Sequence, residues 1–591
     1  MRRCLAVGWA AVLLAVASPA HSGGRVAVEQ GTSVTGLGHA RPVGDEVMRQ
    51  LPPGLRAALP AEVRIHWRDD LPAHVVGRTF AGAVRLDRAL LEPGQQARLH
   101  ATLVHELVHV ADRAGGHWSR SARLRELAGW QRRPWRLGRT PNRFEQRTPD
   151  PYERESPAEY LAVNVEHWLQ DPTFPCRRPA LAAWLVETFG QAPGRVPASC
   201  SRTLPLLAAG EDEGAVELLQ LDPARVYAVD YLFAEGADAP MSRWGHSMLR
   251  LVICREGRAP GPDCRLDLEQ HRVLSFRAFV GDVALSNWRG LSGGYPSRLF
   301  VLPLQQVVDE YTRVQLRSLA SVPIRLQAPE IHGLLERAAQ LHWSYDGRYY
   351  FIGNNCAVET AKLLQAGVPE LADAGIERIT PRGLRRRLER GGWLDEHVFE
   401  DRAAAVREGY YFESADTHYR QLYEVARNEL SLPVQDVRQW LEMAPARRAP
   451  WLQRGGLRST AGLLLLEQAA QRRAELRARD VLKHRLLRRP GERETQQLQR
   501  LLTEAGQWLQ PGSLLTGGYG VPQADELDAL QPALRALEQE GPAAWHALRS
   551  ELRAALPPLQ QRELEGLEAN LDSLRTRLRG LASVAPPVAV Q

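Results

Sequence analysis

The sequence has few cysteines and methionines, with six and five among 591 residues. Beyond the first twenty residues, no apolar stretch reaches the roughly 18 residues that a membrane-spanning helix needs, so no transmembrane helix is expected in the mature chain. RNP, zinc-finger and helix-turn-helix signatures are also absent. The net charge of +6 is small for this length. We therefore do not expect a nucleic-acid partner.

The remaining composition is that of folded protein. The hydrophobic fraction of 44% and the charged fraction of 24% are ordinary for globular chains, which excludes wholesale disorder. A chain of 591 residues exceeds what one hydrophobic core supports, so roughly three or four domains are expected.

The first 22 residues have the pattern of a secretory signal peptide. Arg2 and Arg3 form a positive start, residues 5–17 are apolar, and small residues follow between 18 and 22. A buried first helix is the alternative, but the stretch has no polar face. We expect export to the periplasm, with full secretion as the alternative.

Export makes disulfides permissible, and one cysteine lies inside the signal peptide. Five remain. Cys176 with Cys200 and Cys254 with Cys264 are the natural local pairs. Cys356 is then left over, and an unpaired cysteine in an oxidising compartment is a candidate reactive thiol.

Three regions follow the signal peptide. Residues 45–200 mix strand-like and helical patterns, including a strand over 78–86 and a long helix over 96–114. Residues 225–395 begin with short strand-like runs and continue with helices. Residues 400–591 are helical and rich in Arg, Leu, Ala, Gln and Glu. The sequence thus predicts a multidomain α+β protein with an all-α C-terminal region.

The expected helix over 96–114 carries His105-Glu106-Leu107-Val108-His109, an HExxH motif. Residues four apart lie on one face of a helix, so both imidazoles point toward one cation. Glu106 falls beside them and suits a general base for a metal-bound water.

A catalytic zinc needs a third protein ligand, and a second helical pattern starts at Ser156-Pro157 and contains Glu159-Tyr160-Leu161-Ala162. Together these motifs resemble the gluzincin-type metallopeptidases with a lethal-factor-like catalytic domain. The resemblance implies a zincin-like N-terminal domain binding one zinc ion, with Glu159 as third ligand beside His105 and His109. It implies Tyr152 as oxyanion helper, Asp112 as the carboxylate orienting a histidine, and the strand over 78–86 as the substrate-pairing edge.

A basic, aromatic insertion separates the two helices. It is either a solvated loop or a peripheral contact with anionic lipid headgroups or polymer. Its residues are Trp130, Arg132, Arg133, Trp135, Arg136 and Arg139.

A second candidate site combines His246, in Trp244-Gly245-His246-Ser247, with Cys356, which follows Asn354-Asn355 and opens a helical pattern. A thiolate at a helix N-terminus is stabilised by the helix dipole and free amides. A neighbouring imidazole completes an activated nucleophile. Asn355 or a backbone amide is the candidate oxyanion donor, and Ser275 is the candidate orienting residue.

The order His before Cys resembles the circularly permuted NlpC/P60 branch of papain-like folds. The Trp244-Gly245-His246-Ser247 and Asn354-Asn355-Cys356 motifs, with Thr380-Pro381-Arg382-Gly383-Leu384, resemble the DUF4105 family, which contains Lnb-type lipoprotein N-acyltransferases. The resemblance implies a permuted papain-like domain over 225–395. It implies Cys356 as nucleophile, His246 as base, and an envelope lipoprotein, lipid or peptide as substrate.

Three functions remain open. The first is acyl transfer through Cys356, by a lipid acyltransferase, an amidase or a thiol peptidase. The second is a zinc metallopeptidase whose Cys/His domain binds substrate. The third is a non-catalytic envelope scaffold. Zinc lost on replacing Glu159 is required by the second function, and a reactive Cys356 supports the first.

Overall fold

The structure is a computed structural model. It describes residues 25–28, 37–72, 75–80, 82–130, 147–193, 198–209, 216–236, 245–278, 295–344, 347–349, 354–372, 374–488 and 511–584. The expected signal peptide lies outside the described residues.

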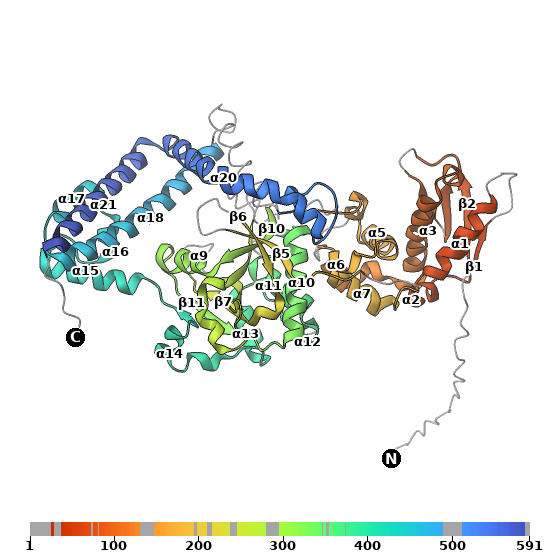
Figure 1. Cartoon of the computed structure of the whole chain (residues 1–591), viewed down its shortest axis with the longest axis horizontal. Helices are drawn as coiled ribbons and strands as arrows, with labels where there is room; N and C mark the ends of the chain where they lie inside the picture. The colour runs from red at the N-terminus through yellow and green to blue at the C-terminus, as the bar shows by residue number, and fades with distance from the viewer. Residues whose placement is uncertain are drawn as a thin grey trace, which may run out of the picture. The chain divides into compact units, whose positions relative to one another are not determined.

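The chain divides into two compact units, and each contains segments from distant parts of the sequence (Figure 1). Unit 1 comprises Met1–Ser121, Ala158–Asp171 and Trp184–Val196. Unit 2 comprises Ala122–Pro157, Pro172–Ala183 and Pro197–Gln591.

Unit 1 contains a four-stranded sheet with the order β1-β2-β4-β3. The first three strands in this order pair in parallel, and β3 closes the sheet antiparallel to β4. The strands are β1 (Arg25–Val28), β2 (Glu62–Arg68), β3 (Gly77–Phe80) and β4 (Ala83–Asp87). The helices are α1 (Leu37–Gln50), α2 (Pro53–Ala57), α3 (Gln96–Ala111) and α5 (Pro157–Gln170), and α7 (Pro179–Phe189) enters the unit at Trp184.

Two expectations for unit 1 were wrong in detail. The single strand expected over 78–86 is a hairpin of β3 and β4, and Gly82 between them has a φ of +80°, which glycine adopts without strain. The helix expected to continue to residue 114 ends its α-helical part at Ala111. A π-helical turn, Asp112–Gly116, follows it.

Helix α3 is buried on its apolar face and also on the polar face that carries Glu106 and His109. Leu103, Val104, Leu107 and Val108 are at most 2% exposed. An apolar helix face packs into a protein core, and burial of the polar face as well restricts the positions of its side chains. Packing against α1 and β3 thus makes α3 a rigid platform for the histidines it carries.

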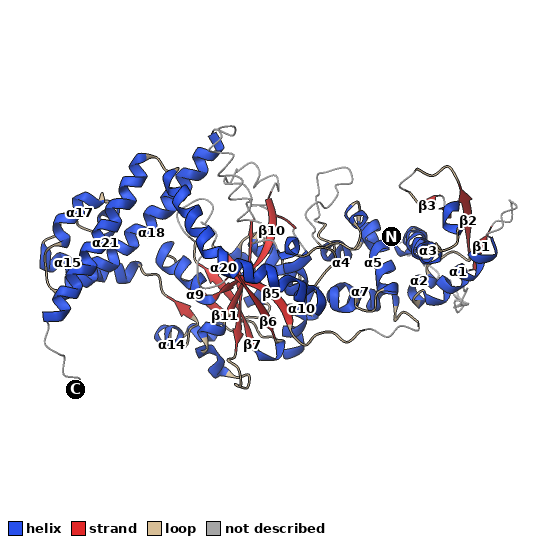
Figure 2. Cartoon of the chain, turned by 45° about the horizontal axis from the view of Figure 1, so that its top comes forward, coloured by secondary structure: helices blue, strands red, loops and turns tan. Residues whose placement is uncertain are grey.

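Unit 2 is built on a nine-stranded sheet with the order β13-β11-β7-β8-β9-β10-β5-β6, and β12 pairs with β10. The pairings are antiparallel except for β10 with β5. Figure 2 shows the strands side by side. They are β5 (Leu204–Ala209), β6 (Val216–Leu221), β7 (Val226–Ala234), β8 (His246–Ile253), β9 (Arg272–Ala278), β10 (Tyr295–Pro303), β11 (Leu319–Pro323), β12 (Gly347–Tyr349) and β13 (Tyr411–Phe412).

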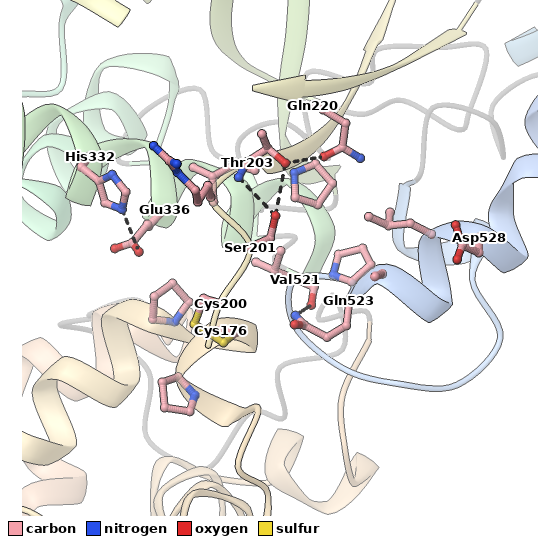
Figure 3. A pocket seen from close by; sticks show the side chains of 18 of the residues that line it. Cys176, Cys200, Ser201, Thr203, Gln220, His332, Glu336, Val521, Gln523 and Asp528 are labelled. Atoms are coloured by element: carbon pink, nitrogen blue, oxygen red, sulfur yellow. Dashed lines mark hydrogen bonds and ion pairs between the residues drawn. A yellow bond between two sulfur atoms is a disulfide. The ribbon is translucent and has the colours of Figure 1, made fainter. Parts of the chain in front are cut away.

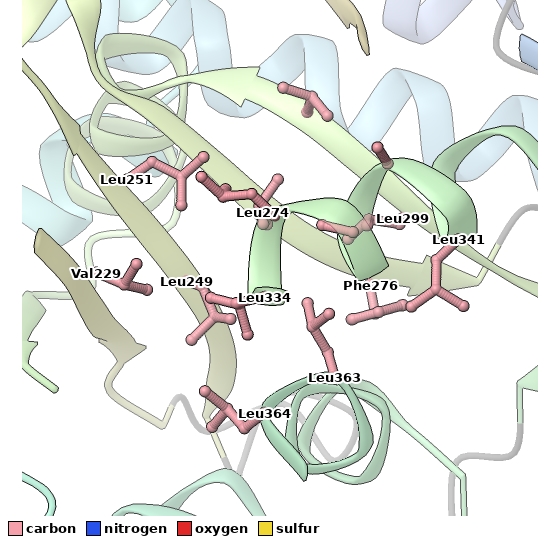
Figure 4. Close-up of a cluster of buried hydrophobic side chains, with 14 of the residues drawn as sticks. Val229, Leu249, Leu251, Leu274, Phe276, Leu299, Leu334, Leu341, Leu363 and Leu364 are labelled. Carbon is pink, nitrogen blue, oxygen red and sulfur yellow. The ribbon is translucent and has the colours of Figure 1, made fainter. Parts of the chain in front are cut away.

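Alternation along the central strands separates two faces of this sheet. Leu249, Leu251 and Phe276 point to one face, where they pack against α10 (Ala328–Ser344) and α11 (Cys356–Gly367) (Figure 4). Met248 and its neighbours point to the other face, where a smaller cluster contains Tyr311 and α9 (Leu304–Val308). Successive residues of a strand face opposite sides, so neighbouring positions on β8 serve different layers.

The described part of unit 2 also contains several short helices. They are α4 (Ala122–Leu127), α6 (Phe174–Arg177), α12 (Pro369–Ala372), α13 (Pro381–Arg390) and α14 (Arg402–Arg407).

The described C-terminal residues are helical apart from β13. Five helices share a core of leucine, alanine, tyrosine and tryptophan side chains. They are α15 (Asp416–Leu430), α16 (Val437–Glu442), α17 (Pro445–Leu452), α18 (Leu457–Arg488) and α21 (Pro558–Val584), while α20 (Ala524–Ala554) contacts β6. The mixed α+β, multi-unit class predicted from the sequence is confirmed. Among the described helices, none combines the length and hydropathy required to cross a bilayer.

Candidate functional site

His105, His109 and Glu159 converge in unit 1. The His105 and His109 Nε2 atoms lie 3.1 Å and 2.9 Å from Glu159 Oε2. One ligand atom from each residue lies within 4.8 Å of the others. Two imidazoles and one carboxylate are the donor set of many catalytic zinc sites, which leave a fourth position open. The three residues therefore fit a single zinc ion.

The local sequence explains this convergence. The two histidines lie one turn apart on α3, and their ring centroids are 4.9 Å apart. Glu159 lies in the first turn of α5. Burial alone would lower the pKa of His105, but Glu159 and Glu166 outweigh it and raise this pKa to about 9. Burial would raise the pKa of Glu159, whereas the two histidines lower it to about 2.

Glu106 is 5% exposed and is held from the sheet side of α3. Its Oε2 atom accepts a 2.6 Å hydrogen bond from the hydroxyl of Thr79 on β3. Gly77 on the same strand makes this approach possible. A Cβ at position 77 would lie 2.6 Å from Thr102 Cγ2 and 3.0 Å from Glu106 Oε1. The sequence motif located Glu106, but only strand pairing brings Thr79 to it.

Asp112, expected to orient a histidine, has its described hydrogen bonds to Ser119, and a different carboxylate lies beside His105. Asp112 accepts hydrogen bonds from the Ser119 amide and hydroxyl, at 2.9 Å and 2.6 Å, because the π-helical turn folds Ser119 back over it. Glu166 Oε2 instead lies 3.7 Å from His105 Nδ1. Glu166 is seven residues after Glu159 on α5, a spacing that places both on one helix face. That spacing was the available signal in the sequence.

The other predicted parts of this site lie outside unit 1 or outside the described residues. Tyr152 belongs to unit 2, in the short helix Pro151–Arg154, and is 51% exposed. Its role as oxyanion helper stays a prediction. Of the basic, aromatic insertion, only Trp130 is described, and the rest lies outside the described residues.

The cysteines pair as expected. Disulfides join Cys176 to Cys200 and Cys254 to Cys264, and Cys356 is free and buried. Cys356 is the first residue of α11. Asn355 caps this helix, because its Oδ1 atom accepts from the amides of Ala357 and Val358. The Asn355 Nδ2 atom donates to the Ile379 carbonyl at 2.8 Å.

Two hydroxyl side chains surround the thiol. The Cys356 amide donates to the Tyr349 hydroxyl at 3.3 Å. Burial raises the pKa of the Cys356 thiol, and hydrogen bonding to Ser247 and Tyr349 opposes that rise. Sequence reasoning missed both residues, although Tyr349 lies on the short strand just before the Asn354-Asn355-Cys356 motif.

His246 opens β8, and its Nε2 atom lies 3.2 Å from the hydroxyl of Ser275 on β9. Arg277 Nε donates to the same Ser275 oxygen at 3.2 Å, and Tyr311 stacks on the imidazole with centroids 6.1 Å apart. Burial, then the charges of Arg277 and Arg317, lower the pKa of His246 to about 3. The contact suggested between His246 and Ser275 is therefore present.

The structure does not join His246 directly to Cys356. Among the described residues, no hydrogen bond links the imidazole and the thiol. Strand alternation explains this, because Ser247 faces α11 while His246 shares the opposite layer with Met248 and Tyr311. Because Ser247 is the second residue of β8, the thiol and the imidazole both lie near the start of this strand. Their pairing stays a prediction.

Comparison with protein families locates this site within a known domain. Residues 215–391 match the Lnb N-terminal periplasmic domain. This Lnb-like domain includes His246, Ser275, Tyr349 and Cys356. The match and the two disulfides indicate a periplasmic protein of the cell envelope.

Residues 116–198 match a second family model, DUF7844, a domain of unknown function. This segment includes Tyr152, Glu159 and Glu166 but begins after the HExxH motif. Its residues are divided between both units. Neither the curated proteins nor the solved structures gave a match to the chain. The gluzincin resemblance therefore stays a prediction.

A separate cavity of about 320 Å³ lies in unit 2 beside the Cys176–Cys200 disulfide (Figure 3). Two pairs of polar side chains occupy its wall. His332 Nε2 lies 3.3 Å from Glu336 Oε1, and the Thr203 hydroxyl donates to Gln220 at 3.1 Å. None of the candidate catalytic or metal-binding residues lines this cavity.

Proposed function

We propose that the Lnb-like domain transfers an acyl group through Cys356. One observation carries the proposal: among the described residues, Cys356 is the only cysteine outside a disulfide, and it opens α11 within the matched domain. The first turn of a helix places the positive end of the helix dipole beside the sulfur, which stabilises negative charge on it. This is the position from which a thiol nucleophile gains most.

The substrate class follows from this chemistry and from the envelope location. The Cys356 sulfur attacks the carbonyl carbon of an ester-linked acyl chain, and the C–O bond to the alcohol breaks. The thiol proton goes to the leaving alcohol by way of His246. An amine, such as the N-terminus of a lipoprotein, then attacks the thioester, which forms an amide and returns the proton to sulfur. An amidase or thiol peptidase would share the first half of this sequence.

Burial raises the thiol pKa and lowers the imidazole pKa, which favours the neutral form of both groups. We therefore propose that His246 acts as a general base during attack, instead of holding a preformed thiolate–imidazolium pair. Catalytic hydrogen bonds are often long before substrate binds and shorten in the complex.

The test is covalent acylation by p-nitrophenyl octanoate, followed by intact-mass and peptide analysis. One octanoyl group on Cys356 is expected in the mature protein, and none in Cys356→Ala. His246→Ala should acylate at least about 100-fold more slowly, the usual contribution of a general base. His397→Ala is the matched control, since His397 is exposed and contacts only Glu400 among the described ion pairs. The proposal would be contradicted if no acylation occurs, if another residue is acylated, or if His246→Ala is acylated as fast as wild type.

A second candidate function is metal-assisted hydrolysis of a peptide bond, and the His105, His109 and Glu159 cluster favours it. These residues would hold zinc, which activates water and polarises a carbonyl when bound. Glu106 Oε would take the proton of the attacking water and deliver it to the leaving amine. Thr79 holds that carboxylate in place.

Metal analysis separates this function from the first. The purified protein should contain one zinc per chain, and Glu159→Ala should lose it. Glu106→Gln should keep the metal and lose hydrolysis of a casein substrate. A wild-type protein that fails to take up zinc after dialysis against it would refute the metal site. A non-catalytic scaffold predicts neither zinc-dependent hydrolysis nor an acylated Cys356.

A further inference from the structure

The amide of Cys356 is already occupied in this structure. It donates to the Tyr349 hydroxyl at 3.3 Å, and both residues are buried, with 5% of Cys356 and 8% of Tyr349 exposed. Pairing of β12 with β10 places Tyr349 opposite Tyr295 and fixes the backbone that carries the phenol. The contact therefore joins the first residue of α11 to the sheet.

This contact bears on where an oxyanion is stabilised. When a cysteine at a helix start attacks a carbonyl, its own amide is normally the nearest donor to the oxygen that becomes negative. Here the phenol oxygen of Tyr349 accepts the hydrogen bond of that amide. The Asn355 side chain is engaged as well, with Oδ1 on the Ala357 and Val358 amides and Nδ2 on the Ile379 carbonyl.

We propose that the Tyr349 hydroxyl is the oxyanion donor of the Cys356 site, with its oxygen accepting from the Cys356 amide and its proton turning from the thiol sulfur to the substrate oxygen as the thiol is acylated. As the sulfur–carbon bond forms, the carbonyl π pair moves onto the substrate oxygen, which accepts the Tyr349 hydrogen bond. When the pair returns, the ester C–O bond breaks and the alcohol leaves with a proton delivered through His246. Tyr349 keeps its own proton throughout. This inference rests on the proposed acyl transfer.

The surroundings of Tyr349 suit a donor that stays protonated. Burial and the neighbouring Cys356 raise the pKa of Tyr349 well above that of a free tyrosine. A hydroxyl that accepts one hydrogen bond also becomes a stronger donor in the next, because hydrogen bonds in a chain polarise one another. The amide, the phenol and the substrate oxygen would form such a chain.

Two reactions of the same thiol test the proposal with Tyr349→Phe, which removes only the hydroxyl. Acylation by p-nitrophenyl octanoate passes through an oxyanion, whereas alkylation by iodoacetamide does not. Tyr423→Phe is the matched control, since Tyr423 is a buried tyrosine of the helical bundle whose hydroxyl donates to the Val434 carbonyl. Both rates are measured from pH 6 to 10, and thermal unfolding monitors folding of each variant.

In Tyr349→Phe we expect acylation to fall about 100-fold, the lower end of the loss of an oxyanion donor. Alkylation, extrapolated for each protein to the fully ionised thiol, should change less than about threefold. Tyr423→Phe should leave both rates unchanged. Equal losses in both reactions would assign Tyr349 a structural role, and unchanged acylation would exclude it as the donor. Either result overturns the inference.

A wild-type comparison covers the case in which Tyr349→Phe does not fold. An octanoyl thionoester presents sulfur, a poor hydrogen-bond acceptor, where the ester presents oxygen. The wild-type protein should therefore prefer the oxygen ester strongly, and Tyr349→His, which keeps a donor, should retain part of that preference. Equal acylation by both esters would refute the donor. If wild-type Cys356 is not acylated by either ester, the proposed function itself fails, a result distinct from failure at Tyr349.

Discussion

Replacing Glu166 by glutamine tests the carboxylate beside His105 without removing a predicted metal ligand. Glu166 Oε2 lies 3.7 Å from His105 Nδ1, while the Nε2 atom of the same ring faces Glu159. A carboxylate on the far nitrogen fixes the tautomer and the ring orientation, so that the near nitrogen presents its lone pair to a metal. Glutamine keeps the size of the side chain but loses the charge.

The size of the effect can be worked out. Loss of such an outer carboxylate weakens metal binding about 10- to 100-fold. At a zinc concentration 100 times the wild-type Kd, bound zinc stabilises the folded state by about 2.7 kcal/mol. At the same concentration, the Glu166→Gln protein should gain only about 1.4 kcal/mol for a tenfold loss, or about 0.4 kcal/mol for a 100-fold loss.

The measurement combines zinc titration against a chromophoric chelator with urea unfolding in zinc and in EDTA. Glu187→Gln is the matched control, since Glu187 is an exposed acid of unit 1 and its loss changes the net charge equally. Glu159→Gln should lose zinc-dependent stabilisation altogether. If Glu166→Gln binds zinc as tightly as wild type while Glu159→Gln does not bind it, the orienting role is refuted.

Three further predictions concern stability. The double variant Cys176→Ser, Cys200→Ser opens a loop of 24 residues, and chain entropy predicts that the free energy of unfolding falls by about 3 kcal/mol. Urea unfolding without reductant measures this loss, and an unchanged free energy of unfolding would contradict the prediction. Burial and, after it, the charge of Arg250 lower the pKa of His271 to about 3. As pH falls from about 6.5 toward 3, this histidine is therefore protonated in the unfolded chain but stays neutral in the folded chain. This stability is full well above pH 6.5, and wild type should lose about 1.6 kcal/mol more than His271→Gln between pH 6.5 and 5. Parallel pH profiles of the two proteins would contradict this prediction. Arg448→Met leaves Glu467 buried without its cation and should cost the helical bundle about 3–5 kcal/mol, and adding Glu467→Leu should recover most of that loss.

Local patterns were sufficient for several features of this protein. Spacing of four residues placed His105 and His109 on one helix face, because helical periodicity depends on neighbours in the chain. Short sequence separation paired the four disulfide cysteines and left Cys356 alone. The motif before Cys356 indicated a helix start, since asparagine is a preferred N-cap. The α+β class followed from the same periodicities.

Other features depended on contacts between distant segments. Packing of α3 and α5 brought Glu166 to His105, and the β3–β4 hairpin brought Thr79 to Glu106. Strand alternation places Ser247, instead of its neighbour His246, beside the Cys356 thiol. Pairing of β12 with the sheet places the Tyr349 hydroxyl beside the Cys356 amide. Composition and spacing describe one segment at a time. Sheet register and helix packing fix which side chains of different segments meet, and these were decided only by the tertiary structure.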